Sequence, residues 1–293
     1  MTDATDAPTI SVVVVNWNGG STVAACLRSL ADNPPSAPWE AILVDNASSD
    51  DSVERVRAEL PWVRVIANDR NLGLAAANNQ GLRASRAPFA LISNPDVMYQ
   101  PGSVDALHEL LRRRERAVFA VARLRDADGT LQTSAGDLPT LREALIGRWL
   151  GRHAQRTEKS GFWWHGWDHD DEERIGHGGE ACYLVRRSAV NEIGLQDERF
   201  VLDWEGVDWS ARAYDAGWEI WFCPQAEVVH LGGVSLRQAP YRWVVLSHRG
   251  MYRYFRRRLP VAARPFVAAV IGARAGVKLA VAAVDAGLYD RAH

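Results

Sequence analysis

Short apolar runs alternate with segments of helical spacing over the first 120 residues of the chain. Residues 10–15 are rich in β-branched side chains, which is typical of a strand buried on both faces of a sheet. In residues 22–31 the apolar side chains instead recur at helical spacing. These two patterns predict an α/β fold with a mainly parallel sheet flanked by helices. The further strands are expected at 41–44, 63–67, 89–92 and 118–121, and the further helices at 52–60, 74–84 and 101–113.

The alternation ends near residue 126. The segment 149–176 is long, charged and aromatic and has no clear period. The chain contains no internal repeat and no low-complexity linker, which favours one large domain followed by a helical appendage. In this part the strands are expected at 181–186, 219–223 and 227–230, and the helices at 188–193, 206–216, 241–259 and 262–284.

Polar loops follow the first four predicted strands. They span residues 16–20, 45–50, 68–73 and 93–96, and each is rich in Asn, Asp, Ser or Gly. Such residues favour turns and helix caps, and that interpretation stays open for any single loop. Because ligands bind at the carboxyl ends of parallel strands, the four loops together predict a polar binding crevice.

Glycine motifs that bind phosphate are absent after the first strand. The chain has no G-x-G-x-x-G there and no Walker-type lysine motif, which argues against dinucleotide oxidoreductases and P-loop enzymes. A nucleotidyltransferase would carry a basic phosphate-binding motif near this strand, and none is present. A carboxylate after the second strand, Asp45, can accept a hydrogen bond from a nucleotide ring N–H. Asp96, after the fourth strand, suits Mg or Mn on the phosphates, since these cations prefer oxygen ligands.

Several of these segments, in this order, resemble family 2 glycosyltransferases of the GT-A fold. The resemblance covers about residues 10–235 and is greatest for the bacterial rhamnosyltransferase-like branch. It implies an α/β GT-A domain with a Rossmann-like sheet at 1–236, followed by a basic amphipathic helical tail at 237–293. Within the domain it implies a nucleotide-sugar half at 9–125 and an acceptor half at 126–236. The segments that carry it are 12–18, 45–50, 71–73, 77–81, 94–96, 200–208, Arg212, 216–218 and 230–235.

The same resemblance implies an inverting transfer of a sugar, with rhamnose favoured, from a dTDP- or UDP-sugar to a lipid-linked or cell-envelope glycan. Asp96 would be the retained carboxylate of an Asp-x-Asp motif at 94–96 and would bind a Mg or Mn ion together with His230. Gly179 and Glu180 would begin the strand that floors the acceptor site. The implied donor-binding residues are Asn16, Asn18, Asp45, Asn46, Ser48, Asn71, Gly73, Asn78 and Asn94.

The chain departs from the family at the catalytic base. Inversion by direct displacement needs a base within hydrogen-bond reach of the acceptor hydroxyl. Family members usually carry a Glu-Asp pair here, with the Asp as base, whereas this chain has Glu205 followed by Gly206. Glu205 is therefore the first candidate for the base, Asp208 the second and Asp203 the third. The alternative is a catalytically weak pseudo-transferase that binds nucleotide sugar or membrane as a scaffold.

Tryptophan is concentrated in the second half of the chain, where 9 of the 12 lie. Aromatic faces suit the C–H surfaces of sugars, so Trp164, Trp167 and Trp204 are predicted to contact the acceptor. Residues 161–171 would then form a loop that closes over the site. Ordinary packing of these rings into a core is the alternative. The neighbouring histidines match no known metal-ligand spacing: His165, His169 and His177.

The net charge of -2 conceals a basic C-terminal tail. Residues 237–293 carry 11 basic and 2 acidic side chains. The net charge of the whole chain excludes a globally basic nucleic-acid-binding protein but not a basic tail. In the last predicted helix, Arg264, Arg274 and Lys278 form a narrow basic stripe on a broad apolar surface. Three cations near its middle argue against a spanning helix, and the pattern favours an anionic membrane interface. The alternative is a helix pair packed on the domain or on a second subunit, as in a homodimer.

Cysteine usage and the N-terminus bear on the compartment. Cys26, Cys182 and Cys223 are odd in number and match neither a zinc site nor a disulfide framework. We expect reduced, buried thiols in a cytosolic protein. The polar N-terminus shows no signal-peptide pattern. The expected location is therefore the cytoplasm, peripheral on the inner face of the cell membrane.

Overall fold

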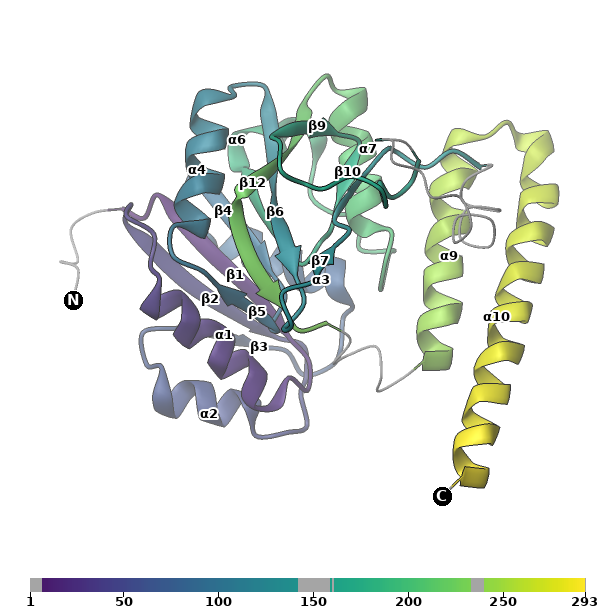
Figure 1. Ribbon diagram of the computed structural model, residues 1–293, viewed down its shortest axis with the longest axis horizontal. Coiled ribbons are helices and arrows are strands. Elements are labelled where there is room, and N and C mark those ends of the chain that lie inside the picture. Colours follow the sequence, from purple (N-terminus) through teal and green to yellow (C-terminus); the bar gives the residue numbers. More distant parts are fainter. Residues whose placement is uncertain (1–6, 142–158, 160, 233–239, 293) are drawn as a thin grey trace.

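The computed structural model describes residues 7–141, 159, 161–232 and 240–292, with side chains up to residue 283. Its centre is a ten-stranded mixed sheet (Figure 1). The motif residues 233–235 and the predicted domain boundary at 236 lie outside the described residues. Eight of the strands follow one another across the sheet in the order β3 (Arg64–Ala67), β2 (Trp39–Asp45), β1 (Ile10–Asn16), β4 (Phe89–Ser93), β11 (Cys182–Arg186), β6 (Ala117–Arg125), β12 (Glu219–His230) and β5 (Val97–Tyr99).

The strands β1 to β4 are all parallel, so their carboxyl ends share one edge of the sheet. β11 runs antiparallel to β4 and joins this block to β6 and β12, which are parallel to each other. The predicted α/β GT-A architecture is therefore confirmed. Short strands complete it: β7 (Leu131–Gln132) pairs with β6, β9 (Glu173–Ile175) pairs with β12, and β8 (Ala135–Gly136) pairs with β10 (His177–Gly178).

Helices cover both faces of the sheet. β1 is therefore buried on both sides, as its sequence predicts. Val12 and Val14 face a core that α1 and α4 close, and Val13 and Val15 face a smaller one that α3 closes. The helices of the domain are α1 (Gly20–Asp32), α2 (Ser52–Glu59), α3 (Leu74–Ala84), α4 (Ser103–Arg113), α6 (Arg187–Ile193) and α7 (Glu205–Asp215).

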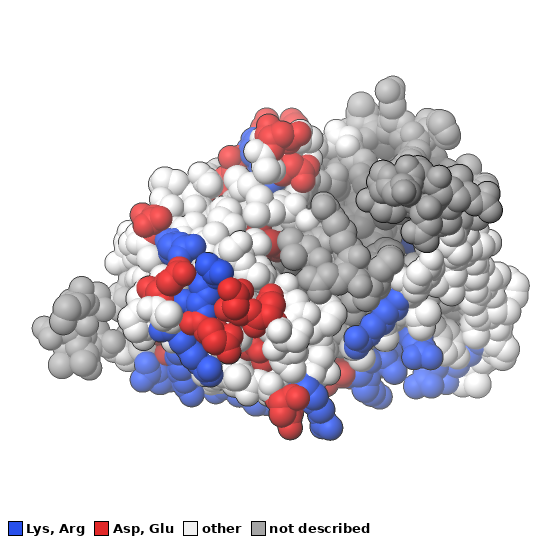
Figure 2. Space-filling model, turned by 90° about the horizontal axis from the view of Figure 1, so that it is seen from below, with Lys and Arg blue, Asp and Glu red and all other residues white. Residues whose placement is uncertain are grey.

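The helical tail forms a hairpin beside the domain (Figure 1). It consists of α9 (Pro240–Arg258), the 3-10 turn η1 (Val261–Ala263) and α10 (Arg264–Ala292). α9 packs on α7, since Tyr254 and Phe255 belong to one buried cluster with Trp204 and Val207. Figure 2 shows Lys and Arg but hardly any Asp or Glu on the right-hand side, where this helix pair lies.

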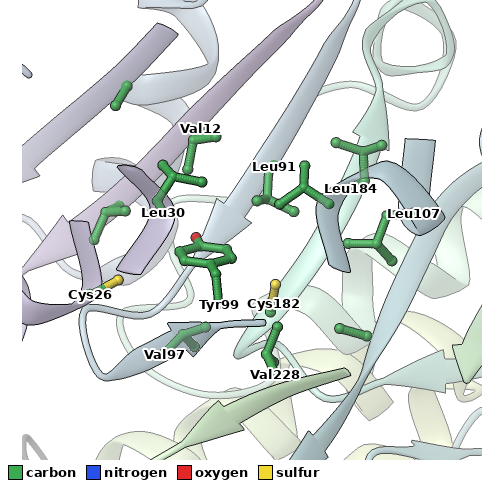
Figure 3. Packing of buried hydrophobic residues seen from close by; sticks show 14 of the residues in the cluster. Val12, Cys26, Leu30, Leu91, Val97, Tyr99, Leu107, Cys182, Leu184 and Val228 are labelled. Carbon is green, nitrogen blue, oxygen red and sulfur yellow. The ribbon is translucent and has the colours of Figure 1, made fainter. Parts of the chain in front are cut away.

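All three cysteines lie in the larger core, and Figure 3 shows Cys26 and Cys182 near Tyr99. Cys26, Cys182 and Cys223 are all free and buried, as predicted. Burial raises the pKa of the Cys182 thiol to about 12, so this thiol stays protonated and unreactive at neutral pH.

β12 differs from its prediction. The sequence suggests two strands, 219–223 and 227–230, but the structure has one strand with a register shift between Cys223 and Glu227. Pro224 lies inside this irregularity, where a residue without an N–H is tolerated. The bulge lets β12 continue along β6 as far as Val229, and His230 pairs with Val97 of β5.

Candidate active site

The ends of β1 and β2 are joined by a network of polar side chains. The strand register sets Asn16 opposite Asp45. Asn16 Nδ2 donates hydrogen bonds to Asp45 Oδ1 (2.9 Å), Ser48 Oγ (3.1 Å) and Ser52 Oγ (2.8 Å). Ser48 also donates to both carboxylate oxygens of Asp45 through its hydroxyl and its N–H. Asn16 therefore fixes the position of the Asp45 carboxylate from the neighbouring strand.

A second contact ties the two loops together. Ser49 N–H donates to Asn18 Oδ1 (2.8 Å), and Asn18 N–H donates to Ser48 Oγ (2.8 Å). Asn18 and Ala47 both adopt positive φ, at 51° and 63°. Asn tolerates this conformation, whereas in Ala it stores backbone strain of the kind found at binding sites.

The loop after β3 is bound to the same network. Asn46 Nδ2 donates to Asn71 Oδ1 (3.0 Å), and Leu72 N–H donates to Asn46 Oδ1 (2.9 Å). Gly73 has φ 88°, and a Cβ there would lie 2.9 Å from the carbonyl oxygen of Val201. This close approach links the predicted donor half of the chain to the segment that leads into α7.

Asn78 lies apart from these loops in a buried chain of amides. Its Nδ2 donates to Gln196 Oε1 (3.1 Å), and Gln196 Nε2 donates to Tyr183 OH (3.0 Å). These contacts give Asn78 a structural role, and contact with the donor stays a prediction.

Asp96 and His230 lie together beyond β4 and at the end of β12. Asp96 Oδ1 is 3.4 Å from His230 Nε2. Gln132 Nε2 donates to the His230 carbonyl (2.8 Å), which directs Gln132 Oε1 to His230 Nδ1 (2.9 Å). Nδ1 therefore carries the proton, and Nε2 presents its lone pair beside a carboxylate. Asn94 Nδ2 is also 3.4 Å from Nε2, so the predicted Asn94, Asp96 and His230 converge.

This pair of acceptors fits a divalent cation that takes only two of its ligands from the protein. The described residues contain no group of three or more His, Cys, Asp or Glu that could hold a metal ion. Two protein ligands would leave the remaining positions to phosphate oxygens and water, which Mg and Mn accept. No sequence pattern singles out Gln132, because it lies 98 residues from His230 in the chain.

Two histidines in and after the tryptophan-rich segment contact backbone carbonyl groups instead of forming a metal site. His169 Nδ1 lies 2.8 Å from the Trp167 carbonyl, and His177 Nε2 lies 2.7 Å from the Phe162 carbonyl. Burial lowers the pKa of His177 to about 4, so its ring is neutral. Both rings act as packing and hydrogen-bonding elements.

Three acidic side chains gather at the start of α7. Glu205 is the first residue of the helix and is 1% exposed. Burial, and then the neighbouring Glu180 carboxylate, raise the pKa of Glu205 well above its usual value. Burial also raises the pKa of Asp203, which accepts a hydrogen bond from Ser247 of α9. Glu180 and Glu205 share a hydrogen bond, so the two carboxyl groups titrate together.

Asp208, the second candidate for the base, is engaged in two ion pairs. Its oxygens lie 2.9 Å from Arg212 Nε and 2.8 Å from Arg257 Nη1, and its side chain is 1% exposed. Arg257 belongs to α9, so Asp208 anchors the helical hairpin to α7. The geometry gives it a structural role.

The predicted acceptor tryptophans are turned into the core, which corrects that interpretation. Trp164 and Trp167 leave 5% and 7% of their surface exposed. Trp164 Nε1 donates to Asp137, and Trp167 packs edge-on against Phe222. Trp204 is also 7% exposed, within the cluster that α9 closes. Core packing, the alternative interpretation, describes all three rings.

Gly179, which is predicted to lie in the strand under the acceptor site, packs closely against Leu124 and Ser134. A Cβ there would lie 3.2 Å from both Leu124 Cδ1 and Ser134 Cβ, and its N–H donates to the Ser134 carbonyl (2.7 Å). The position of its neighbour Glu180, two residues before β11, is therefore fixed.

A mixed, mainly parallel sheet with polar loops at one edge and carboxyl groups at the start of α7 defines a GT-A glycosyltransferase. Residues 11–194 match the family model described as glycosyl transferase family 2. The chain belongs to this family. Glu205 and His230 lie beyond the matched segment.

Relatives and solved structures agree with this class. The chain is 30% identical over 262 residues to N-acetylglucosaminyl-diphospho-decaprenol L-rhamnosyltransferase of Mycobacterium tuberculosis, covering 83% of this chain and 82% of that protein. Its fold is similar to that of a Pyrobaculum calidifontis mannosyltransferase in complex with GDP-Man and Mn2+, with a TM-score of 0.59, 14% identity, and 96% and 77% of the two chains covered. GalNAc-T7 with UDP, GalNAc and Mn2+ gives a TM-score of 0.57 at 18% identity over 77% of this chain, which spans only 44% of that protein.

Proposed function

We propose that this glycosyltransferase moves a sugar, with rhamnose favoured, from a dTDP- or UDP-sugar to a lipid-linked glycan, with inversion at the anomeric carbon. The rhamnosyltransferase relative supports the sugar, and the N-acetylglucosaminyl-diphospho-decaprenol in its name supports a lipid-linked acceptor. Two proteins of similar fold have been solved with a nucleotide or nucleotide sugar and Mn2+, which supports a divalent cation beside the donor.

The observation that carries the proposal is the Asp96–His230 pair. Two acceptors 3.4 Å apart, one on a histidine whose tautomer Gln132 fixes, are suited to a hard cation. They lie at the same edge of the sheet as the Asp45 network, because β1, β2 and β4 are parallel. Nucleotide base and diphosphate can therefore be held by one surface.

The residues of the site divide the work of the reaction. Asp45, held by Asn16 and Ser48, accepts a hydrogen bond from the pyrimidine ring N–H. Asp96 and His230 would hold Mg or Mn, which when bound neutralises the charge that develops on the departing diphosphate. The acceptor hydroxyl oxygen attacks the anomeric carbon as the bond to the diphosphate oxygen breaks. Its proton passes to the carboxyl groups at the start of α7.

The scaffold alternative loses its main argument. It rested on Gly206, where the family has its base. An added Cβ at Gly206 would overlap the carboxyl group of Glu180, so a carboxyl group occupies this position after all. An active transferase is therefore favoured over a pseudo-transferase.

We place the protein at the inner face of the membrane through the outer face of α10. Val261–Ala283 is long and apolar enough to cross a membrane by length and composition, and little of it is buried. Phe266 is 67% exposed, and Val277 and Val281 are each 55% exposed. Because α9 is packed on α7, we propose that the hairpin and the domain move as one unit.

The basic stripe on α10 faces α9, contrary to the membrane-facing stripe that the sequence suggests. Lys278 lies over the Trp243 ring, 5.4 Å from its centre. Lys278 and Arg274 both lower the pKa of His248 on α9, although burial is the larger cause. The outward face is thus apolar, and lipid contact rather than headgroup charge would hold the protein to the bilayer.

Thermal shift measurements test the donor and metal sites. We expect dTDP and UDP, but not GDP, to raise the melting temperature of the full chain in the presence of Mn2+ or Mg2+. Asp96→Ala should remove the metal dependence and leave the melting temperature of the free protein nearly unchanged. Stabilisation by GDP alone would overturn the role given to Asp45. Transfer from dTDP-rhamnose to a lipid-linked N-acetylglucosamine acceptor then tests the reaction itself.

A further inference from the structure

The side chain of Glu180 occupies the space beside Gly206. A Cβ added at Gly206 would lie 2.7 Å from Glu180 Cγ and closer still to Cδ and Oε1. Real Cβ atoms essentially never come this close to other heavy atoms. The missing side chain at 206 and the carboxyl group of Glu180 are therefore one structural feature, in which Glu180, two residues before β11, fills a position on α7.

The pairing of β11 with β4 brings the segment before β11, which contains Glu180, beside the segment after β4. Cys182 lies opposite Ser93, and Asn94 N–H donates to the Ala181 carbonyl (2.8 Å). Glu180 directly precedes Ala181, and Asn94 lies two residues before Asp96 in the chain. A carboxyl group thus lies close to where a donor diphosphate would be held.

Glu180 is also the more accessible member of the carboxyl pair. Glu205 is 1% exposed, and its Oε2 has no hydrogen-bond partner among the described residues. Glu180 is only partly buried and lines a cavity of about 20 Å³ together with Gly206 and Ser210. A cavity of this size is large enough for a water molecule. A hydroxyl group can therefore reach Glu180 more readily than Glu205.

The protonation of the pair agrees with this order. Burial, and then the nearby Asp203, raise the pKa of Glu180 to about 7, while hydrogen bonds from Glu205 and from the N–H groups of Gly206 and Val207 limit the rise. Burial and Glu180 raise the pKa of Glu205 well above its usual value. Above pH 7 the pair therefore has Glu180 as the carboxylate and Glu205 as the acid that donates to it.

We propose that Glu180 is the catalytic base of the sugar transfer, and that its carboxylate replaces the one that the chain lacks at Gly206; this rests on the reaction proposed above. The hydroxyl oxygen of the acceptor forms a bond to the anomeric carbon as the bond from that carbon to the diphosphate oxygen breaks. The hydroxyl proton passes to Glu180, and the nucleoside diphosphate leaves with the bonding electron pair. Glu205 is then a positioning residue, which holds the Glu180 carboxylate by its hydrogen bond.

A purely structural role for Glu180 would be to cap α7. The N–H groups of Gly206 and Val207 point to its carboxylate at the positive end of the helix. Glu180→Gln separates the two roles, because an amide oxygen still accepts these hydrogen bonds and the side chain keeps its volume. Such a variant loses the base and retains the cap.

The first experiment compares Glu180→Gln with the parent chain in transfer assays and in binding of dTDP with Mn2+. We expect kcat to fall about 10²–10⁴-fold, while KM for the donor and the dTDP–Mn2+ stabilisation stay close to the parent values. The acid limb of the kcat/KM profile, near pH 7 in the parent, should disappear. If Glu180→Gln keeps the parent kcat and Glu205→Gln loses it, Glu205 is the base and the proposal is wrong.

The second experiment moves the carboxyl group along the chain. Gly206→Asp alone should be inactive, because its side chain meets Glu180. Glu180→Gly should also be inactive, whereas the double variant Glu180→Gly/Gly206→Asp has room for the new carboxylate and should recover at least part of kcat. A double variant that folds and binds dTDP but is no more active than Glu180→Gly would count against the exchange. A parent that binds dTDP and Mn2+ but transfers no sugar would overturn the proposed function and the base assignment with it.

Discussion

Gln132 Oε1 lies 2.9 Å from His230 Nδ1, and this contact fixes the proton on that nitrogen. The lone pair of Nε2 is therefore directed to Asp96. Such outer contacts orient a ligand ring, and their loss typically costs about 10–100-fold in metal affinity. Of these two strands, β12 contributes the ligand His230, and β7 contributes Gln132, which orients it.

Gln132→Leu should weaken Mn2+ binding about 10–100-fold, since the ring of His230 loses its fixed tautomer. Titration of Mn2+ against the dTDP-dependent thermal shift measures this. Gln225→Leu, at an exposed position in the β12 bulge, is the matched control and should bind Mn2+ like the parent. Equal affinities in both variants would contradict the role of Gln132.

Asp45→Asn should weaken dTDP and UDP binding about 10- to 100-fold, because a charge-assisted hydrogen bond to the ring N–H is lost. Calorimetric titration of the nucleotide gives the dissociation constants. Asp51→Asn removes an exposed carboxylate just before α2 and should leave the dissociation constants unchanged. If both variants bind dTDP equally well, Asp45 does not contact the base.

Asp208→Asn should destabilise the fold without removing the chemistry. The substitution leaves Arg212 and Arg257 without their buried partner, which costs about 3 kcal/mol. Chemical denaturation measures the loss, and Asp215→Asn, in an exposed pair with Arg258, should change stability far less. A complete loss of kcat with unchanged stability would instead restore Asp208 as a candidate for the base.

Charges on the outer face of α10 should release the protein from membranes. Phe266→Glu combined with Val277→Glu places two carboxylates on an exposed apolar face, so folding should be retained and flotation on anionic vesicles lost. Trp62→Glu, at an exposed site on the domain, is the control. Parent protein that resists extraction by alkaline carbonate would show that α10 crosses the bilayer instead of lying on it.

The carboxyl pair should make stability depend on pH in an unusual direction. Burial raises the pKa of Glu180 from 4.5 to about 7, so between these values the folded chain holds a proton that the unfolded chain has released. Its contribution to stability is present below about pH 4.5 and is lost as pH rises to about 7. The melting temperature of Glu180→Gln minus that of the parent should therefore increase over this interval. A difference that stays constant with pH would contradict the raised pKa.

The sequence by itself determined the parallel block of the sheet and the positions of the loops. The β-branched run at 10–15 predicts a strand buried on both sides, and Val12 and Val13 indeed face different cores. Parallel strands bring their carboxyl ends to one edge, so Asp45 and Asp96 could be expected there before any coordinates. These features depend on local periodicity and on topology, both of which a sequence pattern contains.

Only the tertiary structure decided which side chains meet. Glu180 fills the space at Gly206 because the segment between β10 and β11 packs against α7, and no local sequence pattern contains the distance between them. The same holds for Gln132 beside His230 and for Lys278, which turns inward to Trp243. The sequence does not distinguish a tryptophan in a core from one at a binding surface, so the burial of Trp164 follows only from the packing around it. Side-chain partners far apart in the chain are chosen by shape and charge in three dimensions, which a one-dimensional pattern does not contain.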